Sequence, residues 1–440
     1  MSSTKGGQTI TRYLALALLA SLTACSSASS LASNSGASIP TVSAPQVTVR
    51  PNHGASSLPG GFLPCGWPSS QGDDGGGWGS GDGGGDGIFQ DRPPKATCSV
   101  AISSRNQGYG SGNGLHSAGG WQSQNALAPA DIQSAYGFPS GNPGMLVAVV
   151  DAFDNPNVEN DLNIYRTKFG LGPCTTGNGC FRKVNQWGQA YNYPGLNAPW
   201  SHESDLDSQM VSAVCPHCTI LLVEARSPNI DDLGVAVDTA VKLGARVVSN
   251  SYYAIEWAGE RGEDRHYNHP GVAIVVSSGD QSVQGGWGGD TAGSSKEWGP
   301  PYYPATSPYV TAVGGTSLWH DWFDSGWHQS YWLNAAQGCS RYEPRPSFEP
   351  SLCATRSGVD MAAVADPLTG VQMYSKEADG WVVAGGTSVG APIVAAAYAL
   401  SGNPAAAAYS YQHRSGFKAV NGGFINLQTG LGSPFGVSGL

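Results

Sequence analysis

The sequence has few charged residues, few basic residues and no long apolar segment. Charged side chains make up 12% of its 440 residues, whereas an ordinary soluble domain has about 25%. Its 22 Lys and Arg are outnumbered by 32 Asp and Glu, and the absence of a basic block argues against nucleic acid as a partner. The absence of a long apolar run argues against a polytopic membrane protein. Because few ion pairs would be lost in acid, this composition is compatible with an acidic working pH.

The first 25 residues are typical of an export signal. Lys5 and Arg12 precede an apolar stretch over residues 13–24, which is too short to span a membrane as a helix but suits the core of a signal peptide. The stretch ends in LTAC at residues 22–25, which resembles a bacterial lipobox. We expect an exported protein, either a cell-envelope lipoprotein acylated at Cys25 or an extracellular protein with an ordinary cleaved signal. A lipid at Cys25 would be its expected contact with a membrane.

Residues 26–120 are rich in Gly, Ser, Ala and Pro. Such a segment cannot bury enough apolar surface to offset its chain entropy, which predicts a disordered, low-complexity stalk. We expect a single catalytic domain over residues 121–440.

The cysteines indicate disulfides, because eight of them follow Cys25 and an even number in an exported chain usually forms pairs. They are Cys65, Cys98, Cys174, Cys180, Cys215, Cys218, Cys339 and Cys353. The simplest pairing is local, 65–98, 174–180, 215–218 and 339–353, although sequence alone does not fix it. The alternative for residues 174, 180, 215 and 218 is a four-thiolate zinc site.

From about residue 127, short apolar runs alternate with helical patterns. The predicted strands cover residues 145–150, 220–224, 245–248, 272–276 and 309–313, and the predicted helices cover residues 205–214 and 231–243. Val- and Ile-rich strands separated by helices predict an α/β fold with a mostly parallel central sheet flanked by helices. Sites in such sheets lie beyond the carboxyl ends of the strands.

Ser388 lies among glycines and small residues in GGTSVGAPI at residues 385–393, before an Ala-rich helix predicted from Pro392 onward. A serine at a helix N-terminus is exposed, and the backbone N–H groups around it can face a developing oxyanion. A serine in this place can equally cap the helix. The motif alone leaves both interpretations open.

Two acids of the segment WSHESDLDSQMV, residues 200–211, are predicted to share one helix face. Glu203 and Asp207 lie at positions i and i+4, and the apolar stripe of the helix borders them, where acids are rare. Two carboxylates about 4 Å apart repel by about 4 kcal/mol at an effective dielectric near 20, so the pair would tend to share one proton. The alternative is a helix N-terminus whose dipole attracts acids.

Asp280 follows the strand predicted over residues 272–276, in the sequence SSGD. A protonated carboxyl at that strand end could donate a hydrogen bond to an oxyanion. The alternative is an Asx turn, which often follows a strand.

Together and in this order, ESDLDS at residues 203–208, SSGD at 277–280 and GGTSVGAP at 385–392 resemble the sedolisins. These are serine-carboxyl peptidases with a subtilisin-like fold. Residues 302–319, 365–371 and 429–435 also look like sedolisin segments, so the resemblance extends over residues 127–435.

The resemblance implies that Ser388 is the nucleophile and Glu203 its general base. It also implies that Asp207 orients Glu203 and that Asp280 stabilises the oxyanion. A carboxylate base suits acid because at pH 4 a His of pKa ~6.5 is almost entirely protonated. We therefore expect a monomeric serine-type endopeptidase that hydrolyses protein or peptide substrates at acidic pH and loses activity near neutrality.

The chain departs from the sedolisin pattern in three places, one of which is that His202 directly precedes Glu203. Sedolisins usually carry a large folded activation domain, where this chain has its low-complexity stalk. Their calcium loop uses two Asp side chains, and Ala419 and Asn426 stand at the matching positions. Because calcium prefers charged oxygen ligands, we expect weak calcium binding or none, and no other cofactor.

Two rival hypotheses follow from the same residues. Asp151 ends a strand that looks like the one bearing the catalytic Asp of subtilisins, so Asp151, His202 and Ser388 could form a subtilisin-type triad. Alternatively, the chain is a surface protein that kept the fold for binding and lost catalysis. The missing calcium acids and activation domain favour this second hypothesis, whereas the complete acid and serine set argues against it.

Overall fold

The computed structural model describes residues 62–64, 93–98, 100–103, 126–141, 145–280, 301–321, 325–404, 407–421 and 423–440. The expected signal peptide, Cys25, Cys65 and most of the expected stalk lie outside these residues. No helix in the described ranges is both long enough and apolar enough to cross a membrane.

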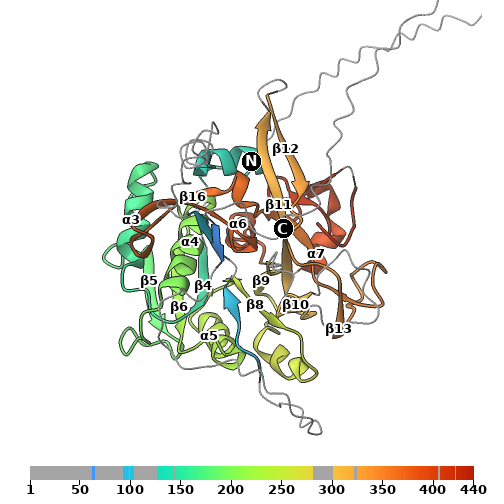
Figure 1. The fold of residues 1–440 in the computed structure, drawn as a ribbon, viewed down its shortest axis with the longest axis horizontal. Coiled ribbons are helices and arrows are strands. Elements are labelled where there is room, and N and C mark those ends of the chain that lie inside the picture. Colours follow the sequence, from blue (N-terminus) through green and yellow to red (C-terminus); the bar gives the residue numbers. More distant parts are fainter. Residues whose placement is uncertain are drawn as a thin grey trace, which may run out of the picture. The chain divides into compact units, whose positions relative to one another are not determined.

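Eight of the described strands form the central sheet (Figure 1), in the order β12-β11-β9-β7-β4-β6-β5, with β15 also paired to β11. They are β4 (Leu146–Ala152), β5 (Phe181–Asn185), β6 (Thr219–Ala225), β7 (Val247–Asn250), β9 (Ala273–Ser277), β11 (Thr311–Asp321), β12 (Gly326–Tyr331) and β15 (Met361–Val364). All of these pairings are parallel except that of β11 with β12. The predicted mostly parallel sheet is therefore confirmed.

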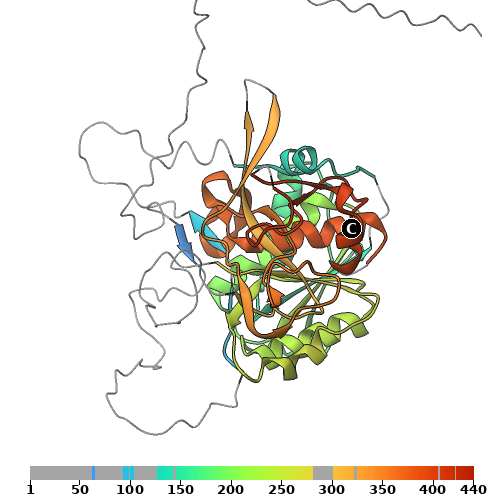
Figure 2. The same ribbon diagram turned by 90° about the vertical axis from the view of Figure 1, so that its right-hand side faces the viewer.

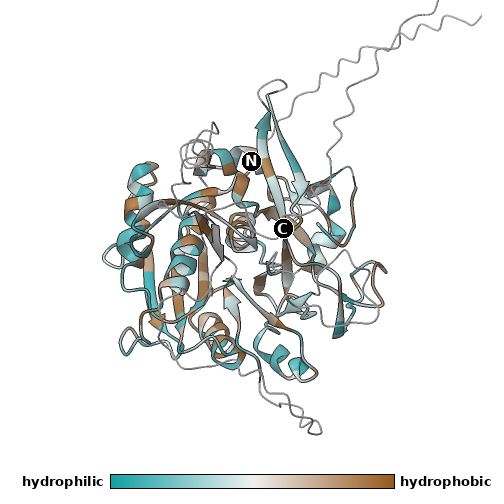
Figure 3. Ribbon diagram, viewed as in Figure 1, coloured by the Kyte–Doolittle hydropathy of each residue, from teal (hydrophilic) through white to brown (hydrophobic). Residues whose placement is uncertain are grey.

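Helices cover both faces of this sheet. Two of them, α4 (Ala198–Val214) and α6 (Thr387–Ser401), pack against each other and against β4, while α5 (Ile230–Lys242) packs on β4 and β6 from the opposite face. Figure 2 shows the sheet between these two layers. In Figure 3 the hydrophobic residues gather on the central strands, whose Val and Ile side chains are almost completely buried. The other α-helices in the described ranges are α2 (Pro129–Tyr136), α3 (Val158–Lys168) and α7 (Ala407–Gln412).

Two helices begin earlier than the sequence analysis predicted. The helix expected from residue 205 begins at Ala198, where the Asn197 side chain accepts a hydrogen bond from the backbone N–H of Trp200. The helix expected from Pro392 begins at Thr387, so Ser388 is its second residue. Gly386 precedes this helix with φ +101°, a conformation that favours glycine.

Part of the expected stalk folds onto the domain. Two short strands from that region, β2 (Thr97–Cys98) and β3 (Ala101–Ser103), pair with β8 (Tyr252–Ile255) and β17 (Gly380–Gly385) respectively. The stalk interpretation is therefore wrong for these residues. The sheets that contain them are completed by β1 (Phe62–Pro64) and β16 (Val371–Ser375) beside β3 and β17, and by β10 (Tyr302–Tyr303) beside β8.

Three of the predicted disulfides are confirmed: Cys174–Cys180, Cys215–Cys218 and Cys339–Cys353. Cys98 is also disulfide-bonded, and Cys65, its expected partner, lies outside the described residues. The zinc alternative is wrong, because its four cysteines form two disulfides.

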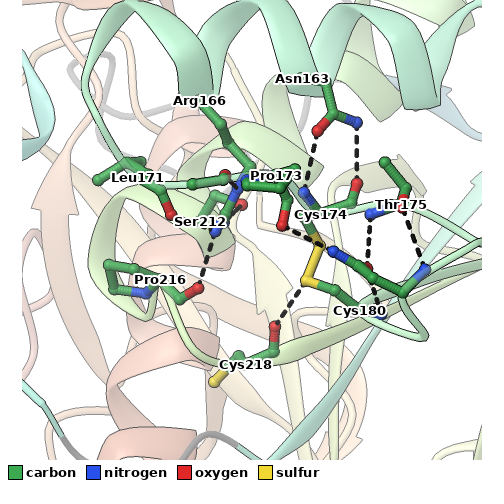
Figure 4. Close-up of a disulfide and its surroundings, with 12 residues drawn as sticks. Asn163, Arg166, Leu171, Pro173, Cys174, Thr175, Cys180, Ser212, Pro216 and Cys218 are labelled. Atoms are coloured by element: carbon green, nitrogen blue, oxygen red, sulfur yellow. Dashed lines mark hydrogen bonds between the residues drawn. A yellow bond between two sulfur atoms is a disulfide. The ribbon is translucent and has the colours of Figure 1, made fainter.

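The disulfides Cys174–Cys180 and Cys215–Cys218, which exclude the zinc site, lie beside each other. Figure 4 shows the sulfur of Cys180 facing the carbonyl of Cys218, from which it is 3.7 Å away. Arg166 of α3 holds the same region together through hydrogen bonds to Ser212 Oγ at 2.8 Å and the Pro216 carbonyl at 3.0 Å.

Candidate active site

Ser388 lies in the strand–turn–helix connection between β17 and α6. As the second residue of α6 it is at the end of the helix where backbone N–H groups are unpaired and the dipole is positive. Its side chain is buried, and its Oγ has no hydrogen-bond partner among the described residues. The hydroxyl therefore does not cap the helix, which removes the alternative left open by the sequence.

Glu203 and Asp207 lie on α4, both with no exposed surface. The helix has no acidic residue in its first turn, so attraction of acids by the helix dipole does not explain them. Ser251, the residue after β7, donates a hydrogen bond from Oγ to Asp207 Oδ1 at 2.8 Å. Burial raises the pKa of Asp207 well above its usual range, and the nearby charge of Glu203 raises it further. The hydrogen bond from Ser251 lowers this pKa by a smaller amount. The raised pKa of Asp207 favours its protonated form, as expected of two carboxyls that share one proton.

Asp280 is held by the residue that precedes Ser388. Thr387 donates two hydrogen bonds to Asp280 Oδ1, from its backbone N and from Oγ1, both at 2.8 Å. The Thr387 hydroxyl also accepts a hydrogen bond from the Gly279 backbone N at 3.1 Å. These partners lie 107 residues away in sequence, so the Asx-turn alternative is wrong for the Asp280 side chain.

Enclosure of the Asp280 carboxyl raises its pKa to about 7, because burial outweighs the two Thr387 hydrogen bonds that favour the ionised form. Below that pH the group is a neutral acid. Since Oδ1 already accepts two hydrogen bonds, the proton belongs on Oδ2, which leaves that oxygen as a donor.

The phenol of Tyr253 interacts electrostatically with both Asp280 and Glu203. Burial raises the pKa of Tyr253 well above the usual range, and the charges of Asp280, of the Tyr302 phenol and of Glu203 raise it further. The rings of Tyr253 and Tyr302 lie 4.7 Å apart. Both rings approach Gly279 so closely that a Cβ there would fall within 3.0 Å of each, which fixes the backbone just before Asp280. Tyr253 was not predicted from the sequence, nor were Ser251 and Thr387 as partners of the acids.

The subtilisin-type triad is not assembled. Both oxygens of Asp151 lack a hydrogen-bond partner within the described ranges, and so does His202 Nε2. His202 instead contacts Glu377, whose backbone hydrogen bond and charge only partly offset the lowering of its pKa by burial. Asp151 is a buried acid in β4, and burial followed by the charge of Asp207 raises its pKa well above the usual range. A subtilisin-type triad needs a hydrogen bond from the His ring to the Asp, and here that bond is not made.

The loop that would hold calcium in the family does not fit that ion. Asn426 Oδ1 already accepts hydrogen bonds from the backbone N of Gln428 at 3.0 Å, the backbone N of Thr429 at 2.7 Å and Thr429 Oγ1 at 3.1 Å. Ala419 supplies no side-chain oxygen. Across the part of the chain that the structure describes, no group of three or more His, Cys, Asp or Glu side chains is arranged to hold a metal ion.

Glu260 and Glu343 are buried acids away from this site, and their raised pKa values make the stability of the protein depend on pH. Burial, followed by the charge of Glu256, raises the pKa of Glu260 to about 9. Burial, followed by the charge of Asp264, raises the pKa of Glu343 to about 8. Both groups bind protons more tightly in the folded than in the unfolded chain, so their contribution is complete below about pH 4.5 and is lost as pH rises toward 8 and 9.

We therefore expect the protein to be more stable in acid than near neutrality. Its free energy of unfolding should fall by at least about 2 kcal/mol between pH 4.5 and pH 8, which corresponds to less than two pKa units in total. Urea unfolding at the two pH values measures this difference. Glu260→Gln should stabilise the protein at pH 8 and leave its stability unchanged at pH 4.5, whereas Asp379→Asn, at an exposed position, should leave the stability unchanged at both pH values. A protein that is more stable at pH 8 would contradict the assignment.

Comparison with known proteins agrees with this architecture. Residues 195–423 match the model of the subtilase family (Peptidase_S8). Kumamolisin from Bacillus sp. (strain MN-32) is 28% identical over 309 residues, which cover 62% of this chain and 51% of kumamolisin. Xanthomonalisin from Xanthomonas sp. (strain T-22) is 25% identical over 323 residues, which cover 62% of this chain and 38% of xanthomonalisin. The chain thus spans about half or less of the length of these relatives.

Among solved structures, the Pseudomonas sedolisin, a serine-carboxyl proteinase complexed with two molecules of pseudo-iodotyrostatin, superimposes with a TM-score of 0.59. It is 23% identical in sequence, and the match covers 70% of this chain and 95% of that one. This similarity confirms the predicted subtilisin-like fold.

Proposed function

The chain belongs to the subtilase family and, within it, to the sedolisins; from this premise we propose that it is an exported serine-type endopeptidase that hydrolyses proteins at acidic pH. The observation that supports this proposal most directly is the attachment of Asp280 to Thr387, beside Ser388. It brings an acid that is neutral below about pH 7 next to the candidate nucleophile. The packing of α4, which carries the acid pair, against α6, which carries Ser388, also supports the proposal.

In the proposed reaction Ser388 Oγ attacks the carbonyl carbon of the scissile peptide bond, and Glu203 takes the hydroxyl proton. Asp207, protonated and held by Ser251, orients Glu203 and stabilises its charge. Asp280 donates its Oδ2 proton in a hydrogen bond to the oxyanion, together with backbone N–H groups at the start of α6. Glu203 then gives its proton to the leaving amine, and water hydrolyses the acyl-enzyme by the same steps in reverse order.

Further parts of the proposal concern the setting of the reaction. We propose that the substrates are proteins or peptides, that the enzyme is monomeric, and that it is exported by the signal at residues 1–25, with Cys25 as the acylated residue of a lipoprotein. We propose that calcium binds weakly or not at all, because Ala419 and Asn426 supply no charged oxygen ligand.

The pH profile of hydrolysis tests the proposed function. Asp280 is a donor below about pH 7 and loses that proton above it, while the general base must be ionised, so activity should be high in acid and fall as pH rises through about 7. The measurement is hydrolysis of a denatured protein from pH 2.5 to 8. An optimum above pH 7 would contradict the carboxyl mechanism, and silence at every pH in a folded protein would favour the binding-protein hypothesis.

A further inference from the structure

Gln209 of α4 binds one residue of β16 through both polar atoms of its side-chain amide. Its Nε2 donates a hydrogen bond to the Tyr374 carbonyl at 2.6 Å, and its Oε1 accepts one from the Tyr374 backbone N at 2.9 Å. The two residues are 165 positions apart in the sequence, and Gln209 is completely buried. The amide thus takes the place of a neighbouring strand, because in an antiparallel ladder a residue exchanges both backbone hydrogen bonds with the residue opposite.

This contact lies on the outer edge of β16. Among the described strands, β16 is the outermost of its sheet, and its inner edge pairs with β17. On the outer edge the backbone N of Gln372 donates to the Leu127 carbonyl at 3.0 Å, and Gln209 binds the backbone of Tyr374 two residues later. The glutamine therefore satisfies backbone groups that would otherwise be left without a strand to pair with.

Gln209 also connects the helix of the acid pair to the strand that leads to Ser388. Helix α4 packs on β16 (Figure 1), β16 pairs with β17, and β17 ends at Gly385, three residues before the serine. On α4, Gln209 follows Asp207 by two residues, which turns its side chain about 200° away from that acid around the helix. Asp207 is bound by Ser251, so buried hydrogen bonds hold α4 on two opposite sides.

A buried glutamine is a costly way to fill this space. An unpaired amide in the interior costs about 1–3 kcal/mol, whereas an apolar side chain of the same length would carry no such risk. An apolar contact is not directional, however, and tolerates sliding of the helix. Hydrogen bonds weaken steeply when their length or angle changes, so the two bonds of Gln209 define the position of α4 more narrowly than packing does.

From this arrangement we propose that Gln209 is a positioning residue, whose bonds to β16 set the spacing between α4 and the β16–β17 pair. This spacing determines how closely the Glu203 carboxyl approaches the Ser388 hydroxyl. The inference rests on the proposed function, because it takes these two groups as base and nucleophile. Proton transfer between them requires hydrogen-bond distance, and a misplacement of about 1 Å can lower a rate by about 10²-fold.

The experiment measures kcat and KM of the full chain and its variants at pH 4 with an internally quenched peptide. Gln209→Met keeps the length of the side chain but removes both hydrogen bonds, so it should lower kcat by about 10–10²-fold and leave KM within about twofold. Gln209→Glu should keep kcat within about threefold, because burial raises the pKa of a carboxyl and a protonated carboxyl both donates and accepts.

A matched control is the glutamine of α2 that also contacts α4. Gln133 Nε2 donates to the Ala213 carbonyl at 2.6 Å, near the end of α4 and away from β16. Gln133→Met should therefore change neither kcat nor KM. Circular dichroism and urea unfolding at pH 4 show whether each variant keeps its fold. If Gln209→Met does not fold, Gln209→Asn replaces it with the same expected result, because its side chain is one methylene too short to make both bonds.

Two outcomes would overturn the inference while the proposed function stands. One is an enzyme that depends on Ser388 but keeps its kcat in Gln209→Met, whether or not that variant is less stable in urea. The other is Gln209→Glu being as slow as Gln209→Met at pH 4, because the hydrogen bonds would then not be what positions α4. Failure of the proposed function is different: the unmodified chain would hydrolyse nothing at any pH, and this inference would fall with it.

Discussion

Replacing Ser388 by Ala should lower the hydrolysis of a denatured protein at pH 4 by at least about 10⁴-fold, because covalent catalysis is then lost altogether. Glu203→Gln should be nearly as damaging, since the amide keeps the shape of the side chain but cannot take the proton from the serine. The double variant should be little worse than either single one, because the two groups act as one unit. Steady-state rates with a fluorogenic protein substrate measure all three.

A matched control for the serine is available on the same helix. Ser401 closes α6 at its far end, where its hydroxyl donates to the Tyr398 carbonyl at 2.8 Å. Ser401→Ala should keep nearly full activity and a normal circular dichroism spectrum. If Ser388→Ala retains more than about a hundredth of the activity, or if Glu203→Gln is fully active, the nucleophile and base have been misassigned.

The sheet could be predicted from sequence because its strands are buried on both faces and consist of continuous Val- and Ile-rich runs. Helix α5 was placed within one residue at each end, since acids mark its start and Gly244 follows its end. The starts of α4 and α6 were missed for a different reason. A start depends on a cap, and the caps here are Asn197, several residues before the apolar pattern begins, and Gly386, whose left-handed backbone is invisible in sequence.

The candidate site was predicted residue by residue, but its supporting contacts were not. Spacing places Glu203 and Asp207 on one helix face, and the strand end delivers Asp280. The bonds from Thr387 to Asp280 and from Ser251 to Asp207 join segments 107 and 44 residues apart, and no local pattern encodes such a pairing. The resemblance to sedolisins located the acids and the serine without showing what holds them.

Strands β2 and β3 show most clearly where composition misleads. Their neighbourhood is Gly- and Ser-rich, which correctly indicates that the segment has too few apolar side chains to fold by itself. The strands form because β8 and β17 supply an edge for pairing, and main-chain hydrogen bonds to an edge need little from the side chains. A sequence pattern therefore does not reveal a strand whose stability comes almost entirely from the strand with which it pairs.

Removal of the Asp280 carboxyl should be the second most damaging change. Asp280→Ala should lower kcat/KM at pH 4 by about 10²–10³-fold, the usual effect of deleting one donor to an oxyanion. Asp280→Asn should stay within about tenfold of the unmodified enzyme, because an amide also donates. The contacts of Thr387 determine how this amide is oriented. Thr387 donates two hydrogen bonds to the position of Oδ1, so that position must hold the amide oxygen. The NH₂ group then takes the place of Oδ2.

The pH dependence separates the two variants further. In the unmodified enzyme the donor is lost as pH rises through the Asp280 pKa of about 7, whereas an amide does not titrate there. The decline of kcat/KM on the alkaline side should therefore move to higher pH in Asp280→Asn. Adding Thr387→Val to Asp280→Asn should lower activity again, because loss of the hydroxyl leaves only the backbone N–H of residue 387 to hold the amide oxygen at the Oδ1 position. If Asp280→Asn is as inactive as Asp280→Ala, or keeps the unmodified pH profile, Asp280 does not act as a hydrogen-bond donor.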